Sequence, residues 1–218
     1  MSQILKSHPV RVGFLIGLSK SCAEKRTDEV LEFFNLRDRS KANVFELSGG
    51  MKRRLAIARS LMGNPTVIVL DEPSTGLDPQ SRNRVWEELA ILKDSGVTVL
   101  LSTHYMEEAA TLCDRLSIMD QGKILDEGTP DQMILKHAPQ EVAQVRVAPG
   151  SLRRVRDYLN KHEISFREVG ALISVTGAEG VAPDLSELDE VDGVRTSYRV
   201  GNLEDVFLTL TGRELRDG

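Results

Sequence analysis

The sequence is poor in cysteine and has no long apolar run. Its two cysteines, Cys22 and Cys113, are too few for a disulfide framework or a cysteine-based zinc cluster. We expect both to pack as small apolar side chains in a reducing compartment. The longest apolar stretch near the start, residues 12–18, is far too short to span a bilayer, and we find no export signal. The sequence therefore predicts a cytoplasmic chain that reaches a membrane only through a partner.

An excess of positive charge is also absent. The net charge is −5, whereas a nucleic-acid footprint needs a basic surface, so we expect no nucleic-acid partner. Two local basic runs, residues 52–54 and 153–154, are predicted to be solvated helix faces. What is present is an ordinary globular balance, with 40% hydrophobic and 28% charged residues over 218 positions. That length allows one substantial core or two small ones.

The first 46 residues are predicted to be helical. Ser21 and Glu24 have the spacing of a capping box. One apolar helical face follows, formed by Ala23, Thr27, Val30, Leu31 and Phe34.

A second helix is predicted over residues 48–62, with Gly63 as its C-cap. Its inward face is formed by Met51, Leu55, Ala58 and Met62. The helix opens on Ser48, Gly49 and Gly50. A serine and two bare glycines at a helix N-terminus present backbone N–H groups to an anion such as a phosphate.

A strand–helix–strand unit is predicted next. The unbroken apolar run at residues 67–70 is typical of a strand buried on both faces in a parallel sheet. Asp78 and Pro79 have the order of an N-cap and a first helical residue. The helix they open carries an apolar stripe, Val85, Trp86, Leu89 and Leu92, and ends at Gly96. A second buried strand over residues 97–104 then completes a βαβ unit with a right-handed crossover.

The remainder is predicted to be a hairpin followed by an α+β domain. Residues 116–128 read as a hairpin that turns at Gln121 and Gly122, and Thr129 with Gln132 forms a capping box. From residue 138 the elements alternate as β, α, β, β, α, β, α, with the second helix at residues 184–191. This order fits a small sandwich with an antiparallel sheet, closed by a helix that Asn202 caps.

Three polar side chains follow the two buried strands. Asp71 and Glu72 end the first strand, and His104 ends the second. Because ligands bind at the carboxyl ends of parallel strands, one carboxylate there could meet Mg²⁺ while the other activates a water. The pair alone is more typical of a simple acidic turn before Pro73, and a lone histidine is usually a surface or core residue. His104 beside two carboxylates makes the two interpretations about even.

The combination of motifs resembles a known family. LSGGMKRRLAIARSL, VIVLDEPSTGLDP and LLSTHYMEEA occur in this order and resemble the signature, Walker B with D-loop, and switch histidine of ATP-binding cassette (ABC) ATPases. The resemblance covers about residues 10–137, and Met51 replaces a glutamine common in the family. SGGMKRR, LCDRL and the ending NLEDVFLTLTGREL are similar to exporter ATPases of the drug-resistance and nodulation-factor type.

The resemblance implies a role for each motif residue. Asp71 would help bind Mg²⁺, Glu72 would be the catalytic base, and His104 would contact the γ-phosphate of ATP. Asp78 would lie in the D-loop across a dimer interface. Ser48, Gly49 and Gly50 would touch the γ-phosphate of ATP held by the opposite subunit.

One motif of the family, the Walker A loop, is not found in the 218 residues. A Walker A loop reads G-x-x-x-x-G-K-[ST], and the single Gly-Lys, Gly122 with Lys123, precedes an isoleucine in a predicted hairpin. The expected fold is therefore α/β, a P-loop NTPase (ABC ATPase) core lacking its N-terminal part, plus a small C-terminal α+β domain. Residues 1–46 would be a remnant of the helical subdomain, 47–137 the second half of the ATPase core, and 138–218 an accessory domain. Strand edges at residues 67–70 would be exposed.

Three functions are compatible with these features. The first is an ATPase subunit of an ABC exporter, with ATP and Mg²⁺ as cofactors and with a second ATPase subunit and transmembrane permease subunits as partners. It would sit on the cytoplasmic face of the membrane through its permease. The second is a truncated, non-catalytic cassette that pairs with and regulates a full-length ATPase. The third, a soluble cassette protein of translation or DNA repair, is disfavoured by the acidic charge and by the exporter-like C-terminal domain.

Overall fold

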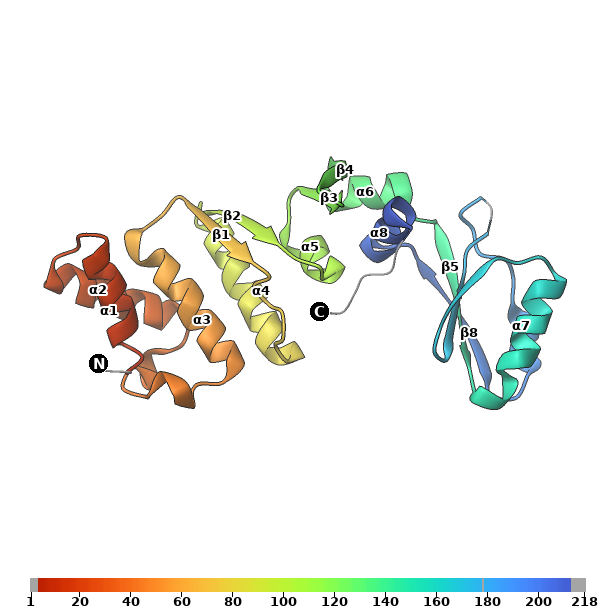
Figure 1. Cartoon of the computed structure of the whole chain (residues 1–218), viewed down its shortest axis with the longest axis horizontal. Helices are drawn as coiled ribbons and strands as arrows, with labels where there is room; N and C mark the ends of the chain where they lie inside the picture. The colour runs from red at the N-terminus through yellow and green to blue at the C-terminus, as the bar shows by residue number, and fades with distance from the viewer. Residues whose placement is uncertain (1–3, 178, 213–218) are drawn as a thin grey trace. The chain divides into compact units, whose positions relative to one another are not determined.

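The computed structural model describes residues 4–177 and 179–212, and it falls into two units, residues 1–108 and 109–218 (Figure 1). The division lies within the short helix α5 (Met106–Leu112). The boundary predicted from composition at residue 138 lies inside the second unit, between its hairpin segment and its antiparallel sheet, and stays a prediction. No helix in the described ranges is both long and apolar enough to cross a membrane.

Three helices pack together at the start of the first unit, α1 (Ser7–Leu15), α2 (Lys20–Phe33) and α3 (Gly49–Ser60) (Figure 1). The predicted inward face of α2 is confirmed, and Ala23 and Leu31 are fully buried. The predicted cap is wrong by two residues. Ser19 accepts a hydrogen bond from the Cys22 backbone N–H. The Cys22 side chain is exposed, so the expectation that it packs as an apolar group is wrong.

The helix α3 begins where the sequence predicted and ends slightly earlier. Ser48 is its N-cap and accepts from the Met51 backbone N–H. After Ser60 the chain tightens into a 3-10 turn, and the left-handed residue that closes it is Asn64, at φ 49°, rather than Gly63. Asparagine adopts this backbone region more readily than most residues other than glycine. The predicted C-cap was misplaced by one residue.

The predicted βαβ unit is present. The strands β1 (Val67–Asp71) and β2 (Thr98–Ser102) are parallel neighbours, and α4 (Pro79–Asp94) connects them. Asp78 caps α4 through the Ser81 backbone N–H, with Pro79 as the first helical residue. The apolar stripe of α4 is buried as predicted, in Val85, Trp86, Leu89 and Leu92.

The strands β1 and β2 are not buried on both faces, so that prediction is wrong. Ile68 is 3% exposed, but Val69 is 71% and Leu100 is 61% exposed. Within the described residues these two strands form a sheet of their own, and helices of the first unit cover one face of it. The other face presents valine and leucine side chains.

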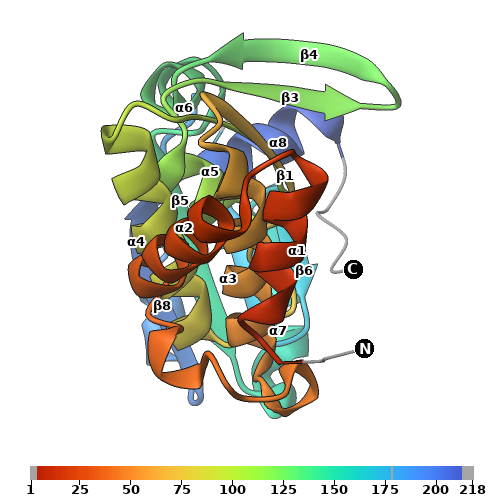
Figure 2. The same ribbon diagram turned by 90° about the vertical axis from the view of Figure 1, so that its left-hand side faces the viewer.

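The second unit begins within α5 and continues with a hairpin of β3 (Leu116–Asp120) and β4 (Lys123–Gly128) (Figure 2). The predicted turn is confirmed, since Gln121 and Gly122 both have positive φ, 49° and 75°. Such a pair suits the right-handed twist of a hairpin. The helix α6 (Pro130–His137) follows with the predicted capping box of Thr129 and Gln132.

An antiparallel sheet forms the rest of the second unit, in the order β6-β7-β5-β8. Its strands are β5 (Glu141–Val147), β6 (Phe166–Val169), β7 (Leu172–Val175) and β8 (Val194–Val200). The helix α7 (Leu152–Lys161) covers one face, burying Val155 and Leu159 against Val145 and Ile173. The helix predicted at residues 184–191 is a 3-10 helix, Ser186–Glu190.

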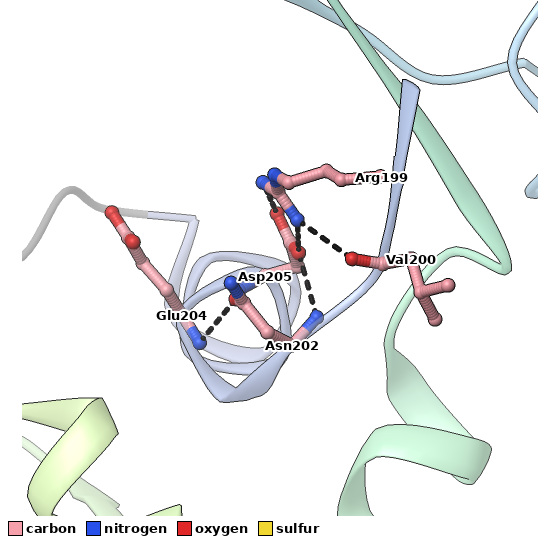
Figure 3. Close-up of polar contacts among 5 residues, drawn as sticks. All are labelled: Arg199, Val200, Asn202, Glu204 and Asp205. Atoms are coloured by element: carbon pink, nitrogen blue, oxygen red, sulfur yellow. Dashed lines mark hydrogen bonds and ion pairs between the residues drawn. The ribbon is translucent and has the colours of Figure 1, made fainter. Parts of the chain in front are cut away.

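The last helix, α8 (Leu203–Thr211), is fixed to β8 by polar contacts (Figure 3). Arg199 donates two hydrogen bonds to Asp205, at 2.6 and 2.9 Å, in the two-pronged geometry that arginine and carboxylate share. Asp205 also accepts from the Asn202 backbone N–H. The side chain of Asn202 caps the helix as predicted, through the Glu204 and Asp205 backbone N–H groups.

Candidate functional site

Asp71 lies at the carboxyl end of β1, directly beside Ser102 at the end of β2. The Ser102 hydroxyl donates to Oδ1 of Asp71. The carboxylate is otherwise exposed to solvent. The parallel register thus delivers one partly engaged carboxylate to the strand ends, where ligands of open parallel sheets bind.

Glu72 and His104 meet at the same strand ends. Oε1 of Glu72 and Nδ1 of His104 lie 3.1 Å apart. The sequence predicted that these two side chains would approach each other, because the two strands are parallel neighbours. The Glu72 backbone N–H still donates to Ser102 O at 2.9 Å, but its φ is 47°. A glutamate in this left-handed region is uncommon, and such residues gather at functional sites.

Aromatic side chains flank His104. Its ring lies 4.4 Å, centroid to centroid, from that of Tyr105. The Arg82 guanidinium lies over the rings of Tyr105 and Trp86, at 5.6 and 5.3 Å. Trp86 in turn donates through Nε1 to the fully buried Glu108, at 2.8 Å. This stack holds the loop after β2 against α4.

The signature residues form a separate group at the N-terminus of α3. A Cβ on Gly50 would come within 2.6 Å of Ser81 Oγ, whereas one on Gly49 would meet only Leu77 Cδ2, at 3.8 Å. Gly50 is therefore required by its packing against the start of α4. Gly49 is exposed to solvent and has room for a side chain. The contacts of this group lie within α3 and at the start of α4, since Ser48 accepts from the Met51 N–H and Gly50 packs on Ser81.

Asp78 caps α4, and its carboxylate is exposed to solvent. Hydrogen bonds from the Ser81 side chain and backbone hold the pKa of Asp78 below its usual value. The carboxylate is thus ionised at neutral pH. Asp78, which resembles a D-loop aspartate, thus also stabilises the N-terminus of α4.

Two arginines that the sequence assigned to a solvated face are structural. Arg54 is 8% exposed and donates to Phe34 O at 2.8 Å, with Glu88 Oε1 at 3.5 Å. Arg53 donates to the backbone carbonyls of residues 71, 72 and 73. The prediction is wrong for Arg53 and Arg54 but confirmed for Lys52, which is exposed. The prediction for residues 153–154 is also confirmed by their exposure.

Helical periodicity could have predicted that Arg53 and Arg54 lie on or beside the buried face of α3. Arg53 and Arg54 follow Gly50 by three and four positions and precede Ile57 by four and three. Gly50 and Ile57 are both buried, so side chains at these spacings lie on or beside the same face. The sequence prediction of a solvated face was based on the run of positive charges and did not use this spacing.

The Asp71 carboxylate is suited to bind one kind of metal ion. Magnesium prefers oxygen ligands and usually takes one or two carboxylates together with phosphate oxygens and water. No group of three or more His, Cys, Asp or Glu side chains in the described ranges could hold a metal ion. With one oxygen bound to Ser102 and the other open, Asp71 fits a magnesium that arrives with a nucleotide rather than a metal held by protein alone.

Known proteins resemble this chain over most of its length. The ABC transporter family model matches residues 5–75. Nod factor export ATP-binding protein I is 43% identical in Cupriavidus metallidurans, 43% in Cupriavidus pinatubonensis and 42% in Burkholderia lata. Each match covers 94% of this chain, and 67%, 62% and 66% of the respective relatives.

Solved structures agree with this assignment. A crystal structure of the ADP conformation of an ATP-binding cassette of an ABC transporter aligns with TM-score 0.54 and 26% identity, over 60% of this chain and 57% of the other. The ATP-binding subunit of another ABC transporter gives 0.52 and 29%, over 62% and 57%. The fold is that of the P-loop NTPase cassettes, as the motifs predicted.

The chain belongs to the ABC transporter ATP-binding protein family. It is similar to Nod factor export ATP-binding protein I, and it spans about two thirds of the length of those relatives.

Proposed function

We propose that these residues are part of the ATP-hydrolysing subunit of an ABC exporter. The observation that carries the proposal is the meeting of Asp71, Glu72 and His104 at the ends of two adjacent parallel strands. Three groups from two strands, one with a left-handed backbone, are arranged for chemistry on a phosphate rather than for a simple acidic turn. The names of the relatives support export as the direction of transport.

Each side chain then has a distinct task. Asp71 would help hold the magnesium that accompanies ATP, and that ion would neutralise charge on the phosphates. Glu72 accepts the proton of the attacking water. His104, 3.1 Å from Glu72, donates to the γ-phosphate and keeps the carboxylate oriented.

The signature group serves a second copy of the cassette. Ser48, Gly49 and the start of α3 present N–H groups and the positive end of a helix dipole. These groups contact the γ-phosphate held by the opposite subunit, with Asp78 at the same interface. Gly50 contributes through its close packing on Ser81. Transmembrane permease subunits would carry the substrate, with this subunit on the cytoplasmic face.

The experiment uses a completed cassette, in which this chain is joined behind a relative's segment that contains a Walker A loop. Glu72→Gln should lower turnover on the order of a hundred- to ten-thousandfold, as loss of a general base does. Binding of Mg-ATP should persist, because the amide keeps the shape and removes a negative charge. Glu87→Gln, an exposed glutamate on α4, is the control and should hydrolyse ATP normally. Near-normal ATPase activity in Glu72→Gln would refute the proposal.

A second candidate is a non-catalytic cassette that pairs with a full-length ATPase. It is compatible with the signature motif at the start of α3, which would act on a nucleotide held by that partner. On this hypothesis the 218-residue chain binds Mg-ATP only weakly, because Walker A supplies most phosphate contacts. Calorimetry showing micromolar affinity would exclude it. An in-frame Walker A upstream of Met1 would favour the first proposal.

A further inference from the structure

The side chain of Arg53 joins the signature helix to the backbone that presents Glu72. Its Nε donates to Pro73 O at 2.7 Å, and its Nη2 donates to the carbonyls of Asp71 and Glu72. Three successive carbonyls thus converge on one partly buried guanidinium. We propose that Arg53 is a positioning residue that fixes the backbone of Glu72 and so the direction of its carboxylate.

The backbone at Glu72 needs such a partner. Its φ of 47° turns the chain sharply at the end of β1, and a side chain with a Cβ is disfavoured in that region. Besides the contacts with Arg53, two backbone hydrogen bonds involve Glu72 itself. The Glu72 N–H donates to Ser102 O, and the Thr75 N–H donates to Glu72 O at 3.3 Å. Pro73 has no N–H to give.

Arginine is suited to this task and lysine is not. The guanidinium offers several N–H donors in a rigid, planar fork, whereas an ammonium is a single flexible point of charge. Arg53 uses two of its nitrogens on carbonyls of three residues. A lysine ammonium has three N–H donors, but they radiate from one nitrogen and lack the fixed spacing of Nε and Nη2. Lysine should therefore restore the geometry only in part.

The contact also connects two parts of the proposed function, on which this inference rests. In that function Ser48, at the N-terminus of α3, contacts a phosphate held by the opposite subunit. Glu72 activates the water that attacks the phosphate bound by its own chain. Arg53 lies on α3 and holds the Glu72 backbone. A displacement of α3 on binding the partner's nucleotide would therefore pass directly to the catalytic carboxylate.

The test compares Arg53→Gln, Arg53→Lys and Arg59→Gln in the completed cassette. Arg59 is an exposed arginine on the same helix, so its variant is the matched control. Arg53→Gln should lower kcat about ten- to a hundredfold, since small misplacements of a catalytic group have effects of this size. The KM for ATP should stay within about twofold, because no ATP contact is removed. Arg53→Lys should fall between Arg53→Gln and the control.

A purely structural role would give a different pattern. The fluorescence of Trp86, the chain's single tryptophan, follows unfolding of the first unit. If kcat in Arg53→Gln equals that of Arg59→Gln, or falls only in proportion to lost folded protein, the positioning role is overturned. A parallel loss of kcat and of ATP affinity would overturn it as well.

A second measurement separates this inference from the proposed function. If the unsubstituted completed cassette lacks ATPase activity, the proposed function fails, and amide hydrogen exchange still tests the contact in the chain itself. The Thr75 amide, which donates to Glu72 O, should exchange about tenfold faster in Arg53→Gln than in Arg59→Gln, as expected for local opening. Equal exchange would overturn the positioning of Glu72 by Arg53.

Discussion

His104 Nδ1 lies 3.1 Å from Glu72 Oε1, across 32 positions of sequence. The histidine side chain is 23% exposed and the glutamate side chain 46%, so both remain open to a ligand while contacting each other. The parallel register of β1 and β2 produces this approach, because Asp71 pairs with Ser102 two residues before His104.

His104→Ala should damage hydrolysis more than binding of ATP. In the completed cassette we expect kcat to fall about a hundredfold, the effect of losing one donor to transition-state charge, with nucleotide affinity nearly unchanged. His162→Ala, an exposed histidine of the second unit, is the control for loss of an imidazole. Equal losses of kcat and of affinity would count against a γ-phosphate contact by His104.

The two signature glycines should differ in their effect on folding. Gly50→Ala should lower stability by about 1–3 kcal/mol, because its Cβ would lie 2.6 Å from Ser81 Oγ in a packed interface. Gly49→Ala should be close to neutral, since its nearest neighbour lies at 3.8 Å. Urea unfolding followed by Trp86 fluorescence measures both. Equal destabilisation by the two variants would show that Gly50 is not packed against α4 in this way.

Glu88 should make stability depend on pH. Burial raises the pKa of Glu88 to about 7, although Arg54 opposes the shift. Between pH 4.5, the ordinary value, and pH 7, the folded state keeps a proton that the unfolded state has lost. The free energy of unfolding should therefore fall as pH rises through this window and level off above it.

Glu88→Gln removes this titration while keeping an acceptor for Arg54. From pH 5 to pH 8 the unsubstituted chain should lose about 2 kcal/mol more stability than the variant, since partial solvent contact reduces the full effect of the shift. Urea titrations monitored by Trp86 fluorescence at the two pH values give the difference. Parallel pH dependence in both proteins would contradict a buried, protonated Glu88.

The sequence predicted those features that depend on local signals. Asp78 and Pro79 at the start of α4, the Gln121–Gly122 turn and the Thr129 capping box each depend on residues within one turn of the chain. The meeting of Glu72 with His104 was predictable too, because parallel strands align their carboxyl ends.

The remainder depended on contacts between distant segments. Arg53 is separated from the carbonyls that it binds by about twenty positions, and a charge run looks the same whether it is solvated or buried. The packing of Gly50 on Ser81 and the positive φ of Glu72 have no local signal either. Burial of β1 and β2 was overestimated because apolar runs do not reveal which layers cover them.

In the proposed function, the start of α3 contacts a phosphate held by a second subunit. Gly49 is the position to test, because an aspartate fits there and a negative charge in the first turn does not weaken the helix itself. Gly50→Asp would confound repulsion with the clash against Ser81. Gly49→Asn supplies the same bulk without the charge.

The most direct measurement is size-exclusion chromatography of the completed cassette with Mg-ATP in a Glu72→Gln background, in which ATP is bound and not hydrolysed. We predict that Glu72→Gln alone elutes as an ATP-dependent dimer. With Gly49→Asp added, the protein should still fold and bind ATP but elute as a monomer, and Gly49→Asn should retain more dimer. If the Gly49→Asp variant dimerises as readily as Glu72→Gln alone, the signature does not contact the partner's phosphate.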